Sequence, residues 1–403
     1  MKVAYYSPLP PSRSGIADYS ALLLPALEER LDLVIARPGR FRRAPKADVA
    51  LYHVGNDAEA HGWIVDALRR RPGIVVLHEF VLHHLVVGLT FARGDAAGYL
   101  AAMEREAGLV GRLLGYAVLD NKLPPLWETR PEDFPLAGEV LDRATGLIVH
   151  SRYVERRARE AGYRGPIRRI PHPAWPVPAI EPAAVEGGPV FGCFGHLNEA
   201  KRVPELLKAF DALRARRPEA TLLLVGGASS RLQRLELPDG VLREEYVPEE
   251  RLWALMAACD AVVGLRSPTM GETSGTTIRA LALGKPLVVS DVGWFAELPH
   301  DVAFKVPVDE REVDRITAAL EALSGEQVRS TMSAAALGLV EREHRLDKVA
   351  EQYAAAVEEL SGGAAVEEHV LHELARAGAE VGIGSDEAAL VTARLREVGL
   401  GEH

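Results

Sequence analysis

Short apolar runs alternate with longer amphipathic stretches along most of the chain. The runs are rich in β-branched residues and have the length of strands that are buried on both faces of a parallel sheet. They lie at 3–6, 31–36, 49–54, 74–77, 146–150 and 167–170 in the first half, and at 190–194, 220–225, 261–265, 286–290 and 302–306 in the second. This repeated strand–helix alternation predicts an α/β protein with doubly wound parallel sheets.

A proline-rich segment divides the pattern near its middle. Prolines recur between residues 171 and 189, where they interrupt any helix, and a new strand-first unit begins directly afterwards. We therefore expect two Rossmann-like domains, 1–172 and 173–340, that face a cleft, because open α/β sheets bind ligands at the carboxyl ends of their strands. Helix 345–361 is expected to pack back on the first domain, and residues 362–403 to form a helical appendage.

Composition narrows the functional class. The 403 residues carry a net charge of −10, which argues against nucleic acid as a partner because binding a phosphate backbone needs a basic face. The two cysteines, Cys193 and Cys259, are too few for a disulfide scaffold or a cysteine-rich metal site. The first residues lack the long apolar stretch of a signal peptide, so a cytoplasmic enzyme is expected.

Common catalytic signatures fail on inspection. The first strand is not followed by G-x-G-x-x-G, and Gly284-Lys285 lacks the other residues of a phosphate-binding P-loop. The second histidine of a zinc-protease helix and the serine of a G-x-S-x-G elbow are both displaced by one position. Nicotinamide, zinc and serine-hydrolase chemistry are therefore disfavoured.

The segment after the strand 190–194 has the pattern of an anion site. The strand leads into Gly195, a short loop passes Lys201, and a helix begins at Val203-Pro204, where proline is tolerated in the first turn. Lys201 then lies beside the positive end of a helix dipole, where backbone N–H groups are free to bind an anion. The alternative is an exposed loop lysine.

A second polar segment follows the strand 261–265. It runs from Arg266 through a loop rich in glycine, serine and threonine to a helix of about two turns, for which Thr273 or Ser274 is the expected cap. Glu272 lies just before the cap and offers two acceptors to sugar hydroxyls. Gly275 and Thr276 offer backbone N–H groups to a sugar or a phosphate.

These two segments, in this order and separation, resemble the donor half of the retaining glycosyltransferases of family 4, which have the GT-B fold. The first is similar to the family motif strand–Gly–x–Leu–x–x–x–Lys, in which a basic residue and the lysine hold the donor pyrophosphate. The resemblance implies that Lys201 clamps the diphosphate. His196 stands where the family usually has arginine.

The second segment resembles the family's pair of glutamates eight residues apart, with two departures. Gly271 holds the first glutamate position, with Glu272 adjacent, and Arg279 holds the second, so the usual ribose-binding carboxylate is absent. Allowing a shift of one residue, we interpret Glu272 as the acceptor of donor-sugar hydroxyls. Arg279 faces a phosphate or pairs with a surface acid.

The first domain contributes further candidates through the same resemblance. Gly15 matches the glycine loop over the transferred sugar, and His78, which follows the strand 74–77, matches the active-site histidine. Asn56 and His61 are weaker candidates. The predicted catalytic residues are His78, Lys201 and Glu272, and the predicted donor-binding residues are Gly15, Gly195, His196, Lys201, Arg266, Glu272, Thr273, Ser274, Gly275, Thr276 and Arg279.

The implied reaction is transfer of a sugar from a nucleoside-diphosphate sugar to an acceptor hydroxyl, with retention at the anomeric carbon and without a cofactor or metal ion. Alternatives are another enzyme on the same scaffold, such as a sugar-nucleotide epimerase or a phosphorylase-like enzyme, and a non-catalytic sugar-nucleotide-binding protein. The acceptor and the oligomeric state stay open. A basic run also makes weak peripheral membrane contact a prediction, with a solvated loop as the alternative: Arg37, Arg40, Arg42, Arg43 and Lys46.

Overall fold

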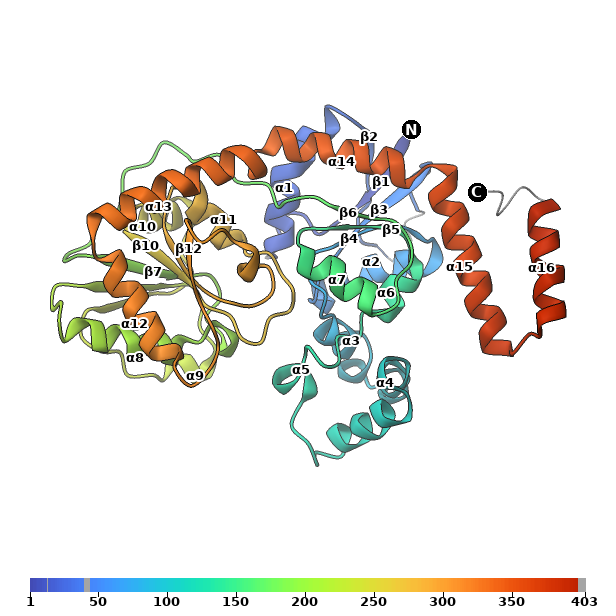
Figure 1. Cartoon of the computed structure of the whole chain (residues 1–403), viewed down its shortest axis with the longest axis horizontal. Coiled ribbons are helices and arrows are strands. Elements are labelled where there is room, and N and C mark those ends of the chain that lie inside the picture. Colours follow the sequence, from blue (N-terminus) through green and yellow to red (C-terminus); the bar gives the residue numbers. More distant parts are fainter. Residues whose placement is uncertain (13, 40–43, 398–403) are drawn as a thin grey trace. The chain divides into compact units, whose positions relative to one another are not determined.

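The structure is a computed structural model that describes residues 1–12, 14–39 and 44–397. The chain divides into two compact units, the first made of Met1–Ile170 with Ala350–His403 and the second of Pro171–Val349. Each unit is built on a six-stranded parallel sheet with helices on its faces (Figure 1). The predicted α/β class with two doubly wound sheets is confirmed.

The sheet of the first unit has the strand order β2-β1-β3-β4-β5-β6, and all of its pairs are parallel. Its strands are β1 (Lys2–Tyr6), β2 (Asp32–Ile35), β3 (Val49–Val54), β4 (Gly73–Leu77), β5 (Ala144–Val149) and β6 (Ile167–Arg169). Each was predicted to within two residues at either end. The order reverses between β1 and β3, so the loops that follow these two strands leave in opposite directions and open a crevice at the carboxyl edge.

Helices cover both faces of this sheet. One face packs on α2 (Ala58–Arg70), α6 (Gly138–Arg143) and α7 (Arg152–Glu160), through a core that includes Leu68, Val75 and Leu147. The other face meets α1 (Gly15–Glu28) and α14 (Leu346–Leu360), which Figure 1 shows close together. A buried pair of hydroxyls joins these two helices, Tyr19 with Tyr353 at 2.6 Å.

The sheet of the second unit has the order β12-β11-β10-β7-β8-β9. Its strands are β7 (Val190–Phe194), β8 (Thr221–Val225), β9 (Val241–Glu244), β10 (Ala261–Gly264), β11 (Leu287–Ser290) and β12 (Ala303–Val306). The sequence pattern did not predict β9. It is a short strand at the sheet edge, with Leu242 half exposed and two charged residues, so it lacks the continuous apolar run of the central strands.

Alternate side chains of β7 and β8 enter two separate cores in the second unit. Phe191 and Leu224 pack on one face, and Phe194 and Leu223 pack on the other, which explains why β7 and residues 222–225 of β8 are apolar throughout. The connecting helices are η2 (Glu199–Lys201), α8 (Val203–Arg214), α9 (Ser230–Gln233), α10 (Glu249–Ala258), α11 (Gly275–Ala282), η3 (Phe295–Glu297), α12 (Glu312–Leu323), α13 (Glu326–Leu339) and η4 (Val340–His344).

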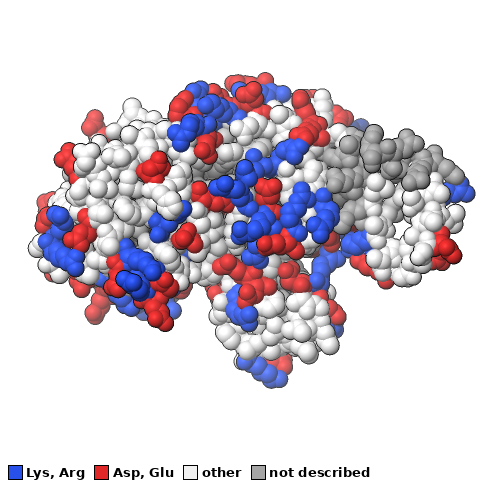
Figure 2. All heavy atoms as spheres, viewed as in Figure 1, with Lys and Arg blue, Asp and Glu red and all other residues white. Residues whose placement is uncertain are grey.

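A small helical lobe interrupts the first unit between β4 and β5. It contains α3 (His83–Leu89), η1 (Phe91–Arg93), α4 (Ala96–Leu119) and α5 (Leu126–Thr129). The backbone of α4 leaves helical geometry at Ala107 and Gly108, and its second half packs back on Met103 through Gly111, where a Cβ would clash with the Met103 carbonyl. Uncharged side chains cover much of this lobe in Figure 2.

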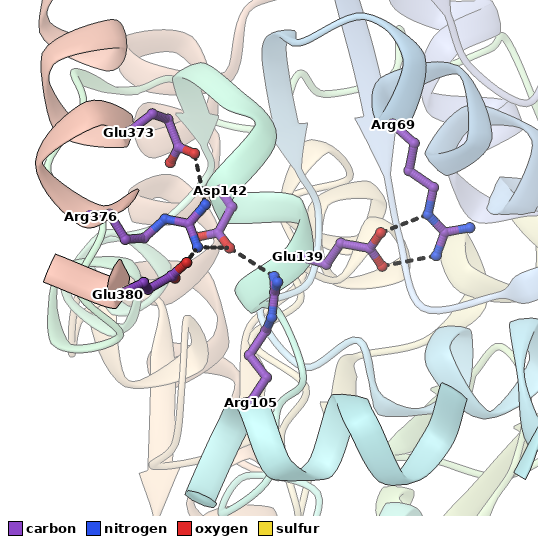
Figure 3. A network of polar contacts seen from close by, with 7 residues as sticks. All are labelled: Arg69, Arg105, Glu139, Asp142, Glu373, Arg376 and Glu380. Atoms are coloured by element: carbon purple, nitrogen blue, oxygen red, sulfur yellow. Dashed lines mark hydrogen bonds and ion pairs between the residues drawn. The ribbon is translucent and has the colours of Figure 1, made fainter. Parts of the chain in front are cut away.

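The chain ends in α15 (Gly363–Val381) and α16 (Ser385–Glu397), separated by a turn in which Gly382 has φ +70°. Arg376 of α15 contacts Asp142 at the end of α6 at 3.7 Å and also contacts two acids of its own helix (Figure 3). Arg105 of α4 binds the same Asp142 oxygen at 2.7 Å. Asp142 therefore links the tail helix to the body of the first unit.

We expect R376A to loosen α15, because it removes the arginine that reaches Asp142. Amide exchange in residues 370–381 should become about two- to fivefold faster, as for loss of an exposed ion-pair network worth about 0.5–1 kcal/mol. E380A is the matched control, since it removes a contact that lies within α15. Equal exchange in the wild type and R376A would show that the network does not hold the helix.

Candidate functional site

The strand order of the second unit indicates where a ligand would bind. The order reverses between β7 and β10, so the loops after these strands separate and leave a crevice at the carboxyl edge. Both segments identified in the sequence follow these strands. A backbone hydrogen bond from Ser267 N to the Ala200 carbonyl, 2.8 Å long, joins the two loops.

The loop after β7 turns sharply at Gly195. Its φ is +92°, and its carbonyl lies so close to Gly226 that a Cβ there would be only 2.2 Å away. The chain then forms η2 and turns again at Arg202, whose φ is +54° and whose Nε lies 3.2 Å from both carboxylate oxygens of buried Glu312. This ion pair holds a left-handed residue directly after Lys201.

Lys201 points inward from this turn. Its side chain is 7% exposed, and its ammonium donates to the Phe194 carbonyl at 2.5 Å. A Cβ built on Gly195 would lie 3.4 Å from both Lys201 Nζ and Thr276 Cγ2, so the ammonium lies near the first turn of α11. The sequence predicted a contact with the start of α8, but the side chain turns towards β7 and α11.

The loop after β10 is braced by Glu272. One oxygen of this carboxylate lies 2.5 Å from Arg266 Nε, and the other accepts from Met270 N at 2.8 Å and from the Thr269 hydroxyl at 3.2 Å. Arg266 is itself fixed by a hydrogen bond from its backbone N to Ser290 Oγ, 2.8 Å long, at the end of β11. Two of about four acceptor positions of Glu272 are therefore occupied by hydrogen bonds within the loop, and Arg266 pairs with the other oxygen by charge.

Helix α11 begins directly after this loop. Ser274 is its cap, and its hydroxyl accepts from Thr277 N at 3.3 Å, which leaves the preceding N–H groups of the first turn, those of Gly275 and Thr276, without helical partners. Of the two caps predicted, Ser274 is the one used. Thr273 and Thr276 flank it, half-buried.

Lys201, Arg266 and Glu272 together give this site a net charge of +1. The pKa of Lys201 is lowered to about 8, chiefly by burial and also by nearby Arg266, against the opposing effects of Cys193 and Glu272. Lys201 is therefore mostly charged at neutral pH. Within the described chain it forms no ion pair, and the negative charge of Glu272 is already shared with Arg266. A buried cation beside free N–H groups is a site for an anion.

Two further predicted donor-binding residues, His196 and Arg279, differ in burial and in contacts. His196 is exposed, although it directly follows Gly195. Arg279 is buried with its guanidinium carbon 3.6 Å from the centre of the Trp175 ring, and it reaches Glu249 at 3.6 Å. Of the two alternatives for Arg279, the structure shows the pair with a surface acid.

The first unit brings together histidines from three neighbouring strands. His78 follows β4 and is bonded from its Nε2 to Nδ1 of His53 on β3 at 3.0 Å. The ring of His150, which follows β5, lies 5.0 Å from that of His78. Neither His53 nor His150 was predicted from the sequence. Their common position near the carboxyl ends of adjacent strands is the signal that could have identified them.

The other candidates of the first unit are Gly15, Asn56 and His61, and their surroundings differ. Gly15 is exposed at the start of α1, where an added Cβ would meet open space. Asn56 Nδ2 donates to His84 Nδ1 at 3.2 Å, and Asn56 Oδ1 accepts from Leu85 N at 3.1 Å, so this side chain fixes the start of α3. His61 is buried, with Nδ1 bound to the Asp57 carbonyl at 3.0 Å.

Neither a metal site nor a membrane span is found in the described chain. No group of three or more His, Cys, Asp or Glu residues is placed to hold a metal ion, within residues 1–12, 14–39 and 44–397. None of the helices described has both the length and the apolar character needed to cross a membrane. Arg40, Arg42 and Arg43 of the basic run lie outside the described residues, so its membrane contact stays a prediction.

Residues 188–325, which include the whole of this anion site, match a family model described as "Glycosyl transferases group 1". The sequence has no match among curated proteins. Sucrose-phosphate synthase from Thermosynechococcus elongatus has a similar structure, with a TM-score of 0.58 and 17% identity over 89% of this chain and 99% of that one.

HepE of Anabaena, solved in complex with UDP and glucose, has a TM-score of 0.57 at 17% identity, over 89% of this chain and 100% of that one. AviGT4, a glycosyltransferase involved in avilamycin A biosynthesis, has a TM-score of 0.53 at 18% identity, over 90% of this chain and 98% of that one. The fold is GT-B. The region that matches the group 1 model contains Lys201, Arg266, Glu272 and α11.

The buried ammonium makes a prediction about stability. Because folding lowers the pKa of Lys201 from its ordinary value of 10.5 to about 8, the unfolded chain binds more protons between these pH values, and stability relative to K201M should rise with pH across that window. Each unit by which the pKa is lowered corresponds to about 1.4 kcal/mol, so the free energy of unfolding should rise by roughly 3 kcal/mol in total relative to K201M.

Denaturant unfolding of both proteins at pH 7, 9 and 10.5 measures this difference. K208M is the control, since Lys208 lies exposed on α8. A constant difference between wild type and K201M across the window would show that the ammonium is solvated in the folded protein.

Proposed function

We propose that this chain is a retaining glycosyltransferase of family 4, which transfers a sugar from a nucleoside-diphosphate sugar to an acceptor hydroxyl. The observation that carries the proposal is the buried, uncompensated ammonium of Lys201 at the β7–β10 crevice, inside the region that matches the glycosyltransferase group 1 model. The related GT-B structure HepE was solved in complex with UDP-glucose, which supports a nucleotide-sugar donor.

The chemistry follows from the charge that develops on the leaving group. Breaking the bond between the sugar and the diphosphate leaves negative charge on phosphate oxygens, and preorganised positive groups lower the barrier by stabilising it. Lys201 supplies a full charge, and the first turn of α11 supplies N–H groups beside it. With these groups the reaction needs no metal ion.

Glu272 has a supporting role in this mechanism. Its carboxylate is held by Arg266, Thr269 and Met270, which orients it and limits its use as a nucleophile. The oxygen beside Arg266 accepts no hydrogen bond from the described residues, and it suits a donor-sugar hydroxyl. A reaction without a protein nucleophile fits front-face attack by the acceptor, which retains the anomeric configuration.

The proposal predicts that K201A loses transfer while it keeps its fold. A ligand screen of thermal stability with UDP-, GDP-, ADP- and TDP-sugars identifies the donor, since binding raises the unfolding midpoint by mass action. With that donor, K201A should lower kcat/KM at least about 100-fold, in the range measured for removing one stabilising group from an active site.

K208A is the matched control, because it removes a lysine of the same unit from the exposed face of α8. Equal turnover in K201A and wild type would refute the assignment of Lys201. A product that is an isomerised donor or a sugar phosphate would identify an epimerase or a phosphorylase-like enzyme instead.

The settings of His196 and Arg279 favour a second candidate, a sugar-nucleotide-binding protein without catalysis. His196 is exposed, and the buried Arg279 stands where a ribose-binding carboxylate is expected. Calorimetric binding of a donor without release of nucleoside diphosphate, in the presence of a panel of hydroxyl acceptors, would support this candidate.

A further inference from the structure

The histidine cluster of the first unit is built from three adjacent strands. His53 lies within β3, and His78 and His150 follow β4 and β5. All three side chains are buried, and the ring centres of His53 and His78 lie 5.2 Å apart. The backbone N of His78 also bonds to the carbonyl of Val54, next to His53, at 3.0 Å. The two rings are therefore held together by both backbone and side chain.

Burial keeps the rings of His53 and His150 neutral. It lowers the pKa of His53 well below the ordinary value, and it lowers the pKa of His150 to about 4. A neutral imidazole has one N–H donor and one acceptor nitrogen. Since Nδ1 of His53 is bonded to Nε2 of His78, one of these nitrogens carries a proton and the other accepts. If His53 donates from Nδ1, His78 accepts at Nε2 and is the Nδ1–H tautomer. If His78 donates from Nε2 instead, the proton of the neutral His53 ring is on its own Nε2.

The surroundings of His53 distinguish the two arrangements. Its Nε2 is buried and has no hydrogen-bond partner among the described residues. Two tyrosine rings also lie near that of His53, with ring centres 4.7 Å away for Tyr5 and 5.9 Å away for Tyr19. The Tyr5 hydroxyl donates to Ser20, and the Tyr19 hydroxyl is bonded to that of Tyr353.

A proton on Nε2 of His53 would thus be a buried donor without an acceptor. Orphaned buried N–H groups are rarer than acceptors left partly unsatisfied. The favoured arrangement places the proton on Nδ1, from which His53 donates to His78. His150 has the same tautomer, because its Nδ1 lies 2.8 Å from the Ile170 carbonyl, which only accepts.

We propose that His53 is a positioning residue that fixes His78 as the Nδ1–H tautomer, so that His78 serves the transfer reaction as a hydrogen-bond donor rather than as a base. This role rests on the proposed function, in which His78 is the active-site histidine. His53 acts only through the hydrogen bond to His78 Nε2. Fixing the tautomer and the ring orientation is the same contribution that a buried carboxylate makes to a catalytic histidine.

The test compares H53N, which keeps a donor N–H near the position of Nδ1, with H53L, which keeps bulk and removes the donor. Long-range ¹H–¹⁵N spectra of histidine-labelled protein at neutral pH report the tautomer directly. We expect the Nδ1–H signature for His78 in wild type and H53N, and its loss in H53L.

The kinetic arm uses the donor identified by thermal shift. H53L should lower kcat about 10- to 100-fold, the range seen when an outer partner of an active-site histidine is removed, with donor KM changed less than threefold. H53N should restore kcat to within about threefold of the wild type. H83N is the control, since His83 is also buried but bonds to Phe134 and Tyr99 of the helical lobe.

An Nε2–H signature for His78 in the wild type would overturn the proposal, as would unchanged spectra and kcat in H53L. The spectroscopic arm needs no substrate. A protein that shows the spectral change but transfers no sugar would therefore refute the proposed function and leave the tautomer assignment standing.

Discussion

A single ammonium group lies beneath the carboxyl end of β7, close to the start of α11. Lys201 is almost fully buried there and donates to a backbone carbonyl, which satisfies one of its three N–H groups but none of its charge. The cost of keeping this cation out of water appears in the lowered pKa of the group. The turns at Gly195 and Arg202 flank the loop that carries Lys201 and direct its side chain inward. Glu272 does not neutralise the ammonium, because its negative charge is shared with Arg266.

The positive charge of the second unit is therefore preorganised by the fold. A preorganised cation does not have to reorganise as charge develops on a leaving group, which makes it more effective than a solvated lysine would be. The first unit is built on a different principle. Its polar cluster of histidines, tyrosines and serines is connected by buried hydrogen bonds of 2.6–3.0 Å, which fix the orientation and the tautomer of its side chains.

The sequence was most informative where burial on both faces imposes a continuous apolar run. The central strands, such as β7, were predicted from these runs. The cap of α11 at Ser274 was predicted from another local signal, a serine directly before a helix. The edge strand β9 was not predicted, because one side of it faces no neighbour strand. Contacts between side chains far apart in the sequence could not be predicted either. No local pattern indicates that Arg279 stacks on Trp175, which belongs to the proline-rich connector. The prediction located Lys201 in the correct loop, and its inward direction depends on the left-handed turn at Arg202.

The most direct measurement of the central claim is the proton uptake that accompanies binding of a nucleoside diphosphate. Calorimetry at pH 9 in two buffers of different ionisation enthalpy gives this number for UDP, or for whichever of GDP, ADP and TDP binds. If the ligand restores the charge of Lys201, whose pKa is about 8 in the free protein, binding takes up about 0.9 proton per site. In K201M it takes up none. Tight binding by the wild type without proton uptake would contradict the account.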